Sequence, residues 1–221
     1  MEKFLIISHV IGGSVVLLLG LFQMFSRKGG KGHVFLGKIY VGALWWVCLS
    51  AFSIITFYRF SAFLLVIAIL TFHTSFVGVR VLQRKIPGTE KWYDWLVSIV
   101  TSLFGIALIG YGVSLLFIGD NNVLVFLCII FGVLTFKNGT DDIRFFLRKN
   151  VDDNLWWLYH HIGSMGGSYI AAVTAFAVQN PSIFIASQSH QWLLWIIPPA
   201  IGNLVIVFTL KRKKLSLAKQ R

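Results

Sequence analysis

The chain has 221 residues, of which 57% are hydrophobic and only 13% are charged, and its mean hydropathy is +0.77. Because soluble domains carry roughly a quarter charged residues, this composition excludes an ordinary soluble domain and predicts a multi-pass membrane protein. The formal net charge of +12 does not indicate nucleic-acid binding, since the basic residues lie between apolar runs, where they set membrane topology.

The apolar runs predict an all-α bundle of seven transmembrane helices, which form a single domain over residues 1–221. A spanning helix needs about 20 predominantly apolar residues. In chain order, the predicted spans cover residues 4–24, 34–57, 61–82, 93–118, 122–136, 155–178 and 191–210. The fifth span is short. Pro198-Pro199 inside the last span predicts a kink, because proline removes a backbone donor.

The basic residues indicate how the bundle is oriented. All 20 Lys and Arg residues except Lys3 and Arg59 fall in the first, third and fifth connections or in the C-terminal tail. Because cytoplasmic segments are enriched in Lys and Arg, we expect the N-terminus outside and the C-terminus in the cytoplasm. This orientation requires an odd number of spans, and seven satisfies it.

Polar and small residues recur at helical spacing in the first and fourth spans. Positions three, four or seven apart share one face of a helix. The predicted inner face carries His9, Gly12, Gly13, Val16, Gly20 and Gln23 in the first span, and Asp94, Ser98, Thr101, Gly105 and Gly112 in the fourth. Polar groups inside a membrane usually face the bundle interior. We therefore expect the first, fourth and sixth helices to face one another.

The sixth span begins with two adjacent histidines, His160 and His161, in a glycine-rich apolar segment. The small residues of this span, including Gly163-x-x-x-Gly167, predict close helix packing on the face that carries both histidines. That face comprises His161, Ser164, Met165, Ser168, Ala172 and Ala175, with His160, Gly167, Ala171 and Thr174 beside it. The opposite face, with Tyr159, Ile162, Tyr169, Ile170, Val173 and Phe176, suits lipid.

Depth along the helices permits a histidine cluster in the inner half of the membrane. A rise of about 1.5 Å per residue places His73, His160 and His161 in that half, and Asp94 and His33 lie near the cytoplasmic boundary, so these five residues can form one cluster. The predicted cofactor-binding residues are His160, His161 and His73, and the predicted metal ligands are His161, His160 and His33. His73 lies opposite the polar face of its own helix, so its membership stays open. His9 lies in the outer third.

Several of these residues also have purely structural interpretations. A lone membrane histidine such as His9, His33 or His73 can simply hydrogen-bond its neighbours. Asp94 can cap the fourth helix, where a carboxylate favours the positive end of the helix dipole.

Two further segments complete the pattern. The connection 138–154 contains acidic and basic residues, and it is either a short interfacial helix or a solvated loop with ion pairs. Cys48 and Cys128 lie within apolar runs without metal-ligand spacing, which predicts small core residues rather than a disulfide framework.

Several short motifs together resemble a bacterial membrane-protein family known as domain-of-unknown-function family 2306. The motifs are His9 with Gly12-Gly13 and Gly20, His33-x-x-x-Gly37-Lys38-Ile39-Tyr40, His161-x-x-x-Met165, Ser168-Tyr169-Ile170-Ala171-Ala172, Thr174-Ala175-Phe176 and Pro198-x-x-x-Gly202. They are spread over most of the chain. The resemblance implies a location in the bacterial cytoplasmic membrane and no established activity.

Three functions follow as alternatives. The first is a haem- or metal-binding membrane redox protein, because neutral imidazole is a versatile ligand. The second is a proton-linked permease or channel, in which Asp94 and the histidines form a relay. The third is a structural or assembly protein without a ligand, in which the same residues hold helices together. The predicted partners are the lipid bilayer and a second membrane protein or copy of the chain, with no nucleic acid.

Overall fold

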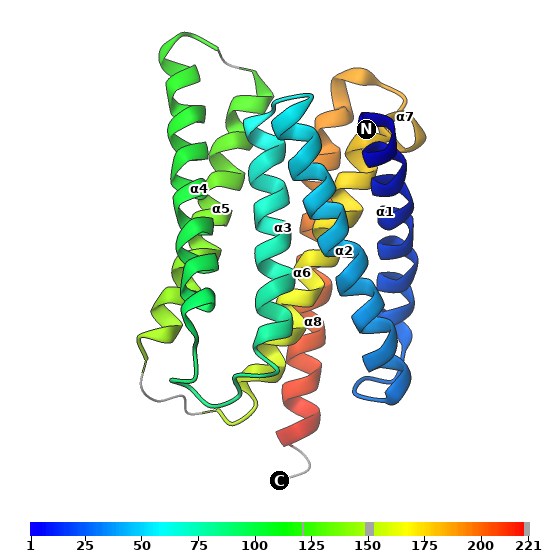
Figure 1. The fold of residues 1–221 in the computed structure, drawn as a ribbon, viewed down its shortest axis with the longest axis vertical. Coiled ribbons are helices and arrows are strands. Elements are labelled where there is room, and N and C mark those ends of the chain that lie inside the picture. Colours follow the sequence, from blue (N-terminus) through cyan, green and yellow to red (C-terminus); the bar gives the residue numbers. More distant parts are fainter. Residues whose placement is uncertain (121, 149–152, 219–221) are drawn as a thin grey trace.

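The computed structural model describes residues 1–120, 122–148 and 153–218 and is all-α, as predicted (Figure 1). Its elements are α1 (Glu2–Phe25), α2 (Lys31–Phe57), α3 (Ala62–Arg80), α4 (Trp92–Phe117), α5 (Val123–Phe146), α6 (Trp156–Gln179), α7 (Pro181–Phe184), the 3-10 helix η1 (Gln188–Trp195) and α8 (Ile197–Ala218). The N-terminus and the C-terminus lie at opposite ends of the bundle (Figure 1).

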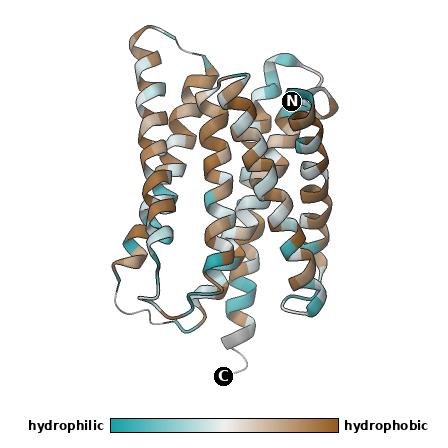
Figure 2. Ribbon diagram, viewed as in Figure 1, coloured by the Kyte–Doolittle hydropathy of each residue, from teal (hydrophilic) through white to brown (hydrophobic). Residues whose placement is uncertain are grey.

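Within the described residues, six segments are long and apolar enough to cross a membrane: α1 to α5, and Gln188–Ser216, which joins η1 to α8. Hydrophobic residues dominate the length of these helices, and hydrophilic residues gather near the turns (Figure 2). The chain is therefore a multi-pass membrane protein whose outer surface contacts lipid. The remaining long helix, α6, is less apolar and packs against α1, α3 and α8.

The order of helices across the bundle differs in one respect from the predicted order. α4 and α5 form one edge of the molecule, and α1 lies at the other (Figure 1). α1 contacts α6, as expected, but α4 packs on α5 and α3 instead of α6. The prediction that the first, fourth and sixth helices face one another is thus wrong for the fourth helix, because α3 and α5 cover the polar face of α4.

Small residues allow α4 and α5 to approach closely. A Cβ atom added at Gly139 would lie 2.5 Å from the carbonyl oxygen of Ser98, and one at Gly105 would lie 2.8 Å from that of Gly132. Both distances are too short for any side chain, so these positions require glycine. The predicted inner face of α4 is buried, namely Asp94, Ser98, Thr101, Gly105 and Gly112.

α5 is longer than predicted and ends at Phe146 instead of residue 136. Its buried positions continue at spacings of three or four past that point, as Cys128, Gly132, Thr135, Gly139, Asp142 and Phe146. Residues 138–146 are therefore neither an interfacial helix nor a solvated loop. Residues 149–152 of the same predicted connection lie outside the described part of the chain. Cys48 and Cys128 are buried, as predicted for small core residues.

The double proline lies at the start of α8 rather than inside a continuous last span. η1 ends at Trp195, and Pro198 and Pro199 follow within the first turn of α8. Proline is tolerated there because the first turn of a helix has no carbonyl partner for its N–H groups. In place of the predicted kink, the structure has a break between η1 and α8, just before the prolines.

The bulky face of α6 contacts other helices instead of lipid. The Tyr169 ring occupies the space left by Gly20 of α1, and its hydroxyl donates to the Leu17 carbonyl at 3.2 Å. Ile170 packs where Gly202 of α8 has no side chain. The prediction that this face meets lipid is wrong for these residues, because α6 is central and α1 and α8 cover it.

Candidate functional site

Three titratable side chains from three helices meet inside the bundle. Asp142 of α5 has only 5% of its side chain exposed. Its Oδ2 lies 3.1 Å from Nε2 of His73 on α3, and its Oδ1 lies 3.4 Å from Nε2 of His160 on α6. We call these three residues the His–Asp–His cluster. Its carboxylate is shared by two imidazoles, which are side chains that can bind and release a proton.

The two histidines differ in their access to the surroundings. His73 has 3% of its side chain exposed, and neither of its ring nitrogens makes a hydrogen bond of good geometry, so its contact with Asp142 is a close ion-pair approach. His160 has 27% of its side chain exposed and packs beside the rings of Phe145 and Trp156. His160 is thus the accessible member of the cluster, and His73 is the enclosed one.

Asp142 is the residue that the sequence analysis missed. The charges of Lys137, Asp141 and Arg144 make this part of the chain look like a loop, but these three side chains pair with one another on the exposed face of α5. Only Asp142 faces inward, and it lies ten residues after buried Gly132 and three after buried Gly139. That helical spacing was the available signal.

A second buried ion pair lies next to the cluster and fixes the start of α4. Arg80 donates from Nε and Nη2 to the two carboxylate oxygens of Asp94, each at 2.8 Å. Asp94 also accepts the backbone N–H of Lys91 at 2.9 Å, so it caps α4 as the structural interpretation proposed. Because Arg80 and Lys91 occupy its carboxylate, Asp94 belongs to this pair and not to the His–Asp–His cluster.

Arg84 provides a fixed positive charge close to Asp142. It is buried in the segment after α3, with its guanidinium 4.6 Å from the centre of the Phe146 ring. Burial lowers the pKa of Arg84, whereas Asp142, Asp94 and Glu90 act in the opposite direction. Arginine stays protonated in proteins, so its charge favours the ionised form of Asp142.

The other predicted histidines lie apart from the cluster. His161 donates from Nδ1 to the Gly78 carbonyl at 2.7 Å, and so joins α6 to α3. His33 lies 3.2 Å from the hydroxyl of Ser26, at the turn between α1 and α2. His9 lies 2.9 Å from the hydroxyl of Ser50. The structure therefore brings His73 and His160 together, and leaves His161, His33 and His9 with hydrogen bonds to neighbouring groups.

The remaining predicted interior residues fall at several helix contacts. Gln23 donates to the His33 carbonyl at 2.8 Å, and Ser168 lies 3.0 Å from the hydroxyl of Tyr40. Ser98 and Thr101 are buried in the α4–α5 contact. Ser164 lines a cavity, which is described below. These side chains are interior or partly interior, but they do not form one site.

The arrangement of histidines does not fit a metal centre. The Nδ1–H bond of His161 to a carbonyl is also found for metal-ligating histidines. Over the described ranges, however, no group of three or more His, Cys, Asp or Glu side chains is placed to hold a metal ion. His73 and His160 instead approach one carboxylate. The predicted haem or transition-metal centre thus gains no support from these residues.

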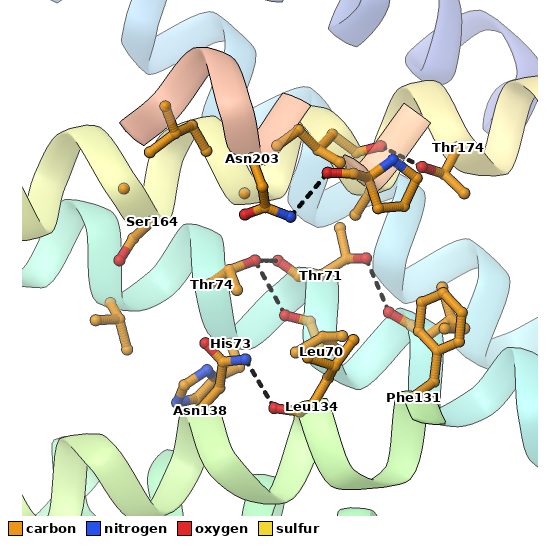
Figure 3. Close-up of a pocket in the computed structure, with 18 of the residues that line it drawn as sticks. Leu70, Thr71, His73, Thr74, Phe131, Leu134, Asn138, Ser164, Thr174 and Asn203 are labelled. Carbon is orange, nitrogen blue, oxygen red and sulfur yellow. Dashed lines mark hydrogen bonds between the residues drawn. The ribbon is translucent and has the colours of Figure 1, made fainter. Parts of the chain in front are cut away.

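A cavity of about 420 Å³ lies between α3, α5, α6 and α8, and Figure 3 shows His73 among its lining residues. His73, Asp142 and His160 all line it. The polar lining also includes Thr71, Thr74, Asn138, Thr174 and Asn203, and the apolar lining includes Ile67, Phe131 and Trp195. The cavity is large enough for a small ligand, since ligand sites usually measure about 300–1,000 Å³.

This fold and site define the class as a multi-pass membrane protein with a buried titratable cluster beside a ligand-sized cavity. Comparison with models of known protein families, with curated proteins and with solved structures found no match.

Proposed function

We propose that this protein is a proton-linked permease, and that the His–Asp–His cluster is its proton-binding centre. The observation that carries the proposal is the position of buried Asp142 between His73 and His160 on the wall of the cavity. Ionisable groups within a membrane are costly and are typical of proton and solute pathways. The sequence suggested a proton relay formed by Asp94 and the histidines, and in this proposal Asp142 replaces Asp94 as the carboxylate of that relay.

The geometry supports a stepwise transfer. A proton on Nε2 of His160, which faces the cavity, can pass to Oδ1 of Asp142. The carboxylic acid group can then rotate about its Cβ–Cγ bond, which turns the protonated oxygen toward α3. It can pass this proton to an unprotonated Nε2 of His73, which restores the carboxylate. Each step breaks one N–H or O–H bond and forms one across a contact of 3.4 or 3.1 Å. These separations shorten readily to hydrogen-bond length, as catalytic contacts do in other proteins.

The topology belongs to the same proposal. We take α6 as a seventh membrane span, with the N-terminus outside and the C-terminus in the cytoplasm, because the basic residues favour this orientation. The cluster then lies toward the cytoplasmic ends of α3 and α5. The resemblance to domain-of-unknown-function family 2306 favours a bacterial cytoplasmic membrane.

Proton flux through reconstituted protein tests the proposal. Purified full-length protein is placed in phospholipid vesicles that contain the pH dye pyranine, and a potassium gradient with valinomycin drives protons inward. The same vesicles then receive an amine, a carboxylic acid and a neutral solute in turn, because a tightly coupled permease moves protons only with its substrate. We expect faster acidification than in protein-free vesicles under at least one of these conditions.

Matched variants connect the flux to the cluster. Asp142→Asn and His73→Gln should reduce the flux to nearly that of protein-free vesicles. Asp120→Asn should retain wild-type flux, because Asp120 is exposed and precedes the first turn of α5, whereas Asp142 lies near the last turn of that helix. Equal flux in wild type and Asp142→Asn, or no flux above protein-free vesicles under any condition, would rule out the proposed function.

A further inference from the structure

Five polar side chains of the cavity turn their hydrogen-bond donors toward the backbone of their own helices. The hydroxyls of Thr71, Thr74 and Thr174 donate to carbonyl oxygens one turn earlier in their own helices, at 2.8, 3.0 and 2.7 Å. Asn138 and Asn203 do the same with Nδ2, each at 2.8 Å, as Figure 3 shows. All five side chains line the cavity, so its uncommitted polar atoms are mainly oxygen acceptors.

The orientation of the two amides follows from these bonds. A backbone carbonyl can only accept, so the amide atom that faces it must be the NH₂ group. The Oδ1 atoms of Asn138 and Asn203 are thereby left free. Asp142 adds its carboxylate oxygens, whereas the exposed carboxylate of Asp141 pairs with Lys137 and Arg144. The lining residues of the described chain include no Lys or Arg. A cavity lined in this way complements a ligand that donates hydrogen bonds and carries positive charge.

Glycine provides the room for such a ligand. Gly163 and Gly167 of α6 both line the cavity, and a Cβ atom added at either would meet nothing within 4 Å. In the α4–α5 contact, by contrast, added Cβ atoms at Gly105 and Gly139 would collide with the neighbouring backbone. The Gly163-x-x-x-Gly167 motif was expected to bring helices together. Here it leaves space between them.

The cavity opens sideways, toward the lipid. Leu134 and Asn138 of α5 and Asn203 of α8 line it and are exposed, whereas Thr71, His73 and Thr174 at its back are buried. α5 packs against α4 and α3, and α8 packs against α6, so the opening lies between α5 and α8. A ligand can therefore reach the cavity from the bilayer. Its apolar part would contact Phe131, Trp195 and Ile67.

We propose that the cavity binds an organic ammonium ion, namely a protonated amine on an apolar body, with the ammonium group beside Asp142. This inference rests on the proposed permease function and names its substrate class. The ammonium and an imidazolium proton on His160 or His73 compete for the same carboxylate, because two positive charges beside one negative charge repel each other. Binding of the amine therefore releases a proton, and this exchange couples the two.

The other charges near the carboxylate are balanced or fixed. Asp141 pairs with Lys137 and Arg144 on the exposed face of α5, and Arg80 pairs with Asp94. Arg84 remains a constant positive charge, and His161 bonds to Gly78. The pH dependence of amine binding should thus follow the two imidazoles of the cluster. The affinity should rise as the pH increases, because fewer protons then compete with the ammonium for the carboxylate.

The test measures equilibrium binding of dansylcadaverine, a fluorescent primary amine, to full-length protein in phosphatidylcholine nanodiscs. Energy transfer from tryptophan reports binding, because Trp195 lines the cavity. A dansyl carboxylic acid of the same chain length is the matched ligand control. We expect saturable binding of the amine, with an affinity at least about tenfold above that of the acid, since charge-assisted hydrogen bonds to Asp142 favour the cation.

Variants locate the bound amine. Gly167→Leu should fill the cavity and abolish saturable binding. Gly110→Leu, on the exposed face of α4, is the control and should leave binding unchanged. Both glycines face open space, but only Gly167 lines the cavity. Asn203→Leu should weaken binding. Asn180→Leu is its control, since Asn180 makes the same bond to a carbonyl four residues earlier but lies outside the cavity lining.

The outcomes separate this inference from the permease proposal. Equal affinity for the amine and the acid, or binding that Gly167→Leu does not change, would overturn the inference even if Asp142-dependent proton flux is observed. Amine binding that is lost in Gly167→Leu but does not change with pH would contradict competition at the cluster. Amine binding without any proton flux would support the ligand class and reject the permease.

Discussion

Nε2 of His73 and Oδ2 of Asp142 lie 3.1 Å apart where α3 meets α5, with 3% and 5% of the two side chains exposed. A buried carboxylate is stable only when neighbouring donors or cations compensate its charge. Here the compensation comes from two imidazoles and from Arg84. Because imidazole can gain or lose a proton near neutral pH, the net charge of this group of residues is adjustable.

Two adjacent aspartates of α5 should contribute very differently to stability. Asp142→Asn keeps the side-chain shape but removes the charge that faces His73, His160 and Arg84, and we expect a loss of about 1–3 kcal/mol. Asp141→Asn alters only exposed pairs with Lys137 and Arg144, and it should change stability by less than about 0.5 kcal/mol. Equilibrium unfolding of the detergent-solubilised variants measures both. Similar losses for the two would contradict the inward position of Asp142.

Loss of one partner of the Arg80–Asp94 pair should destabilise the protein more than replacement of both. Because removal of one partner leaves an uncompensated buried charge, Asp94→Asn should destabilise the protein by about 3–5 kcal/mol. Replacement of both residues, as Arg80→Met with Asp94→Leu, should recover part of that loss. The exposed Arg59–Glu2 pair is the control, and Glu2→Gln should cost less than about 1 kcal/mol. The unfolding midpoints of wild type, Asp94→Asn, the double variant and Glu2→Gln measure these differences.

Glycines of α4 to α6 should differ by their surroundings. Gly139→Ala forces a Cβ against the Ser98 carbonyl, so we expect a loss of about 1–3 kcal/mol. Gly110→Ala meets open space and should be neutral or gain up to about 1 kcal/mol, because alanine has the higher helix propensity. Gly167→Ala should resemble Gly110→Ala. A large loss at Gly167 would show that another helix contacts it.

Reporter fusions test the orientation of the bundle. A cytoplasmic reporter joined to the C-terminal end should be active, and a periplasmic reporter inserted at Asp120 should be active as well. The reason is the concentration of Lys and Arg at the first, third and fifth connections and in the C-terminal tail. An active periplasmic reporter at the C-terminal end would refute the orientation and the seven-span count together.

The fold class was predictable from the sequence because hydropathy acts over whole helices. The buried face of α4 was also predictable, since polar and small residues repeat there at helical spacing. The surroundings of α6 were not, because no periodicity reveals that α1 and α8 cover Tyr169 and Ile170. The length of α5 was underestimated because exposed charges at Lys137, Asp141 and Arg144 concealed the buried spacing that leads to Asp142.

The candidate site was predictable only in part. The paired histidines of α6 indicated its location, and the structure places His160 in the cluster while His161 bonds to Gly78. The sequence left open whether His73 belongs to the site, because His73 lies opposite the hydroxyl groups of α3. The structure resolves this, since α3 is covered on both sides by α5 and α6. Such contacts between distant segments cannot be read from the spacing within one helix.

The charge state of the two cluster histidines is the most direct test of the central claim. Solid-state ¹⁵N NMR of histidine-labelled protein in lipid vesicles distinguishes imidazole from imidazolium, and His73→Gln and His160→Gln assign the signals. We predict an imidazolium signal from this pair that grows as the pH falls and that is weaker at each pH in Asp142→Asn than in wild type, because the carboxylate stabilises the added proton. An identical titration of His73 and His160 in wild type and Asp142→Asn would contradict it.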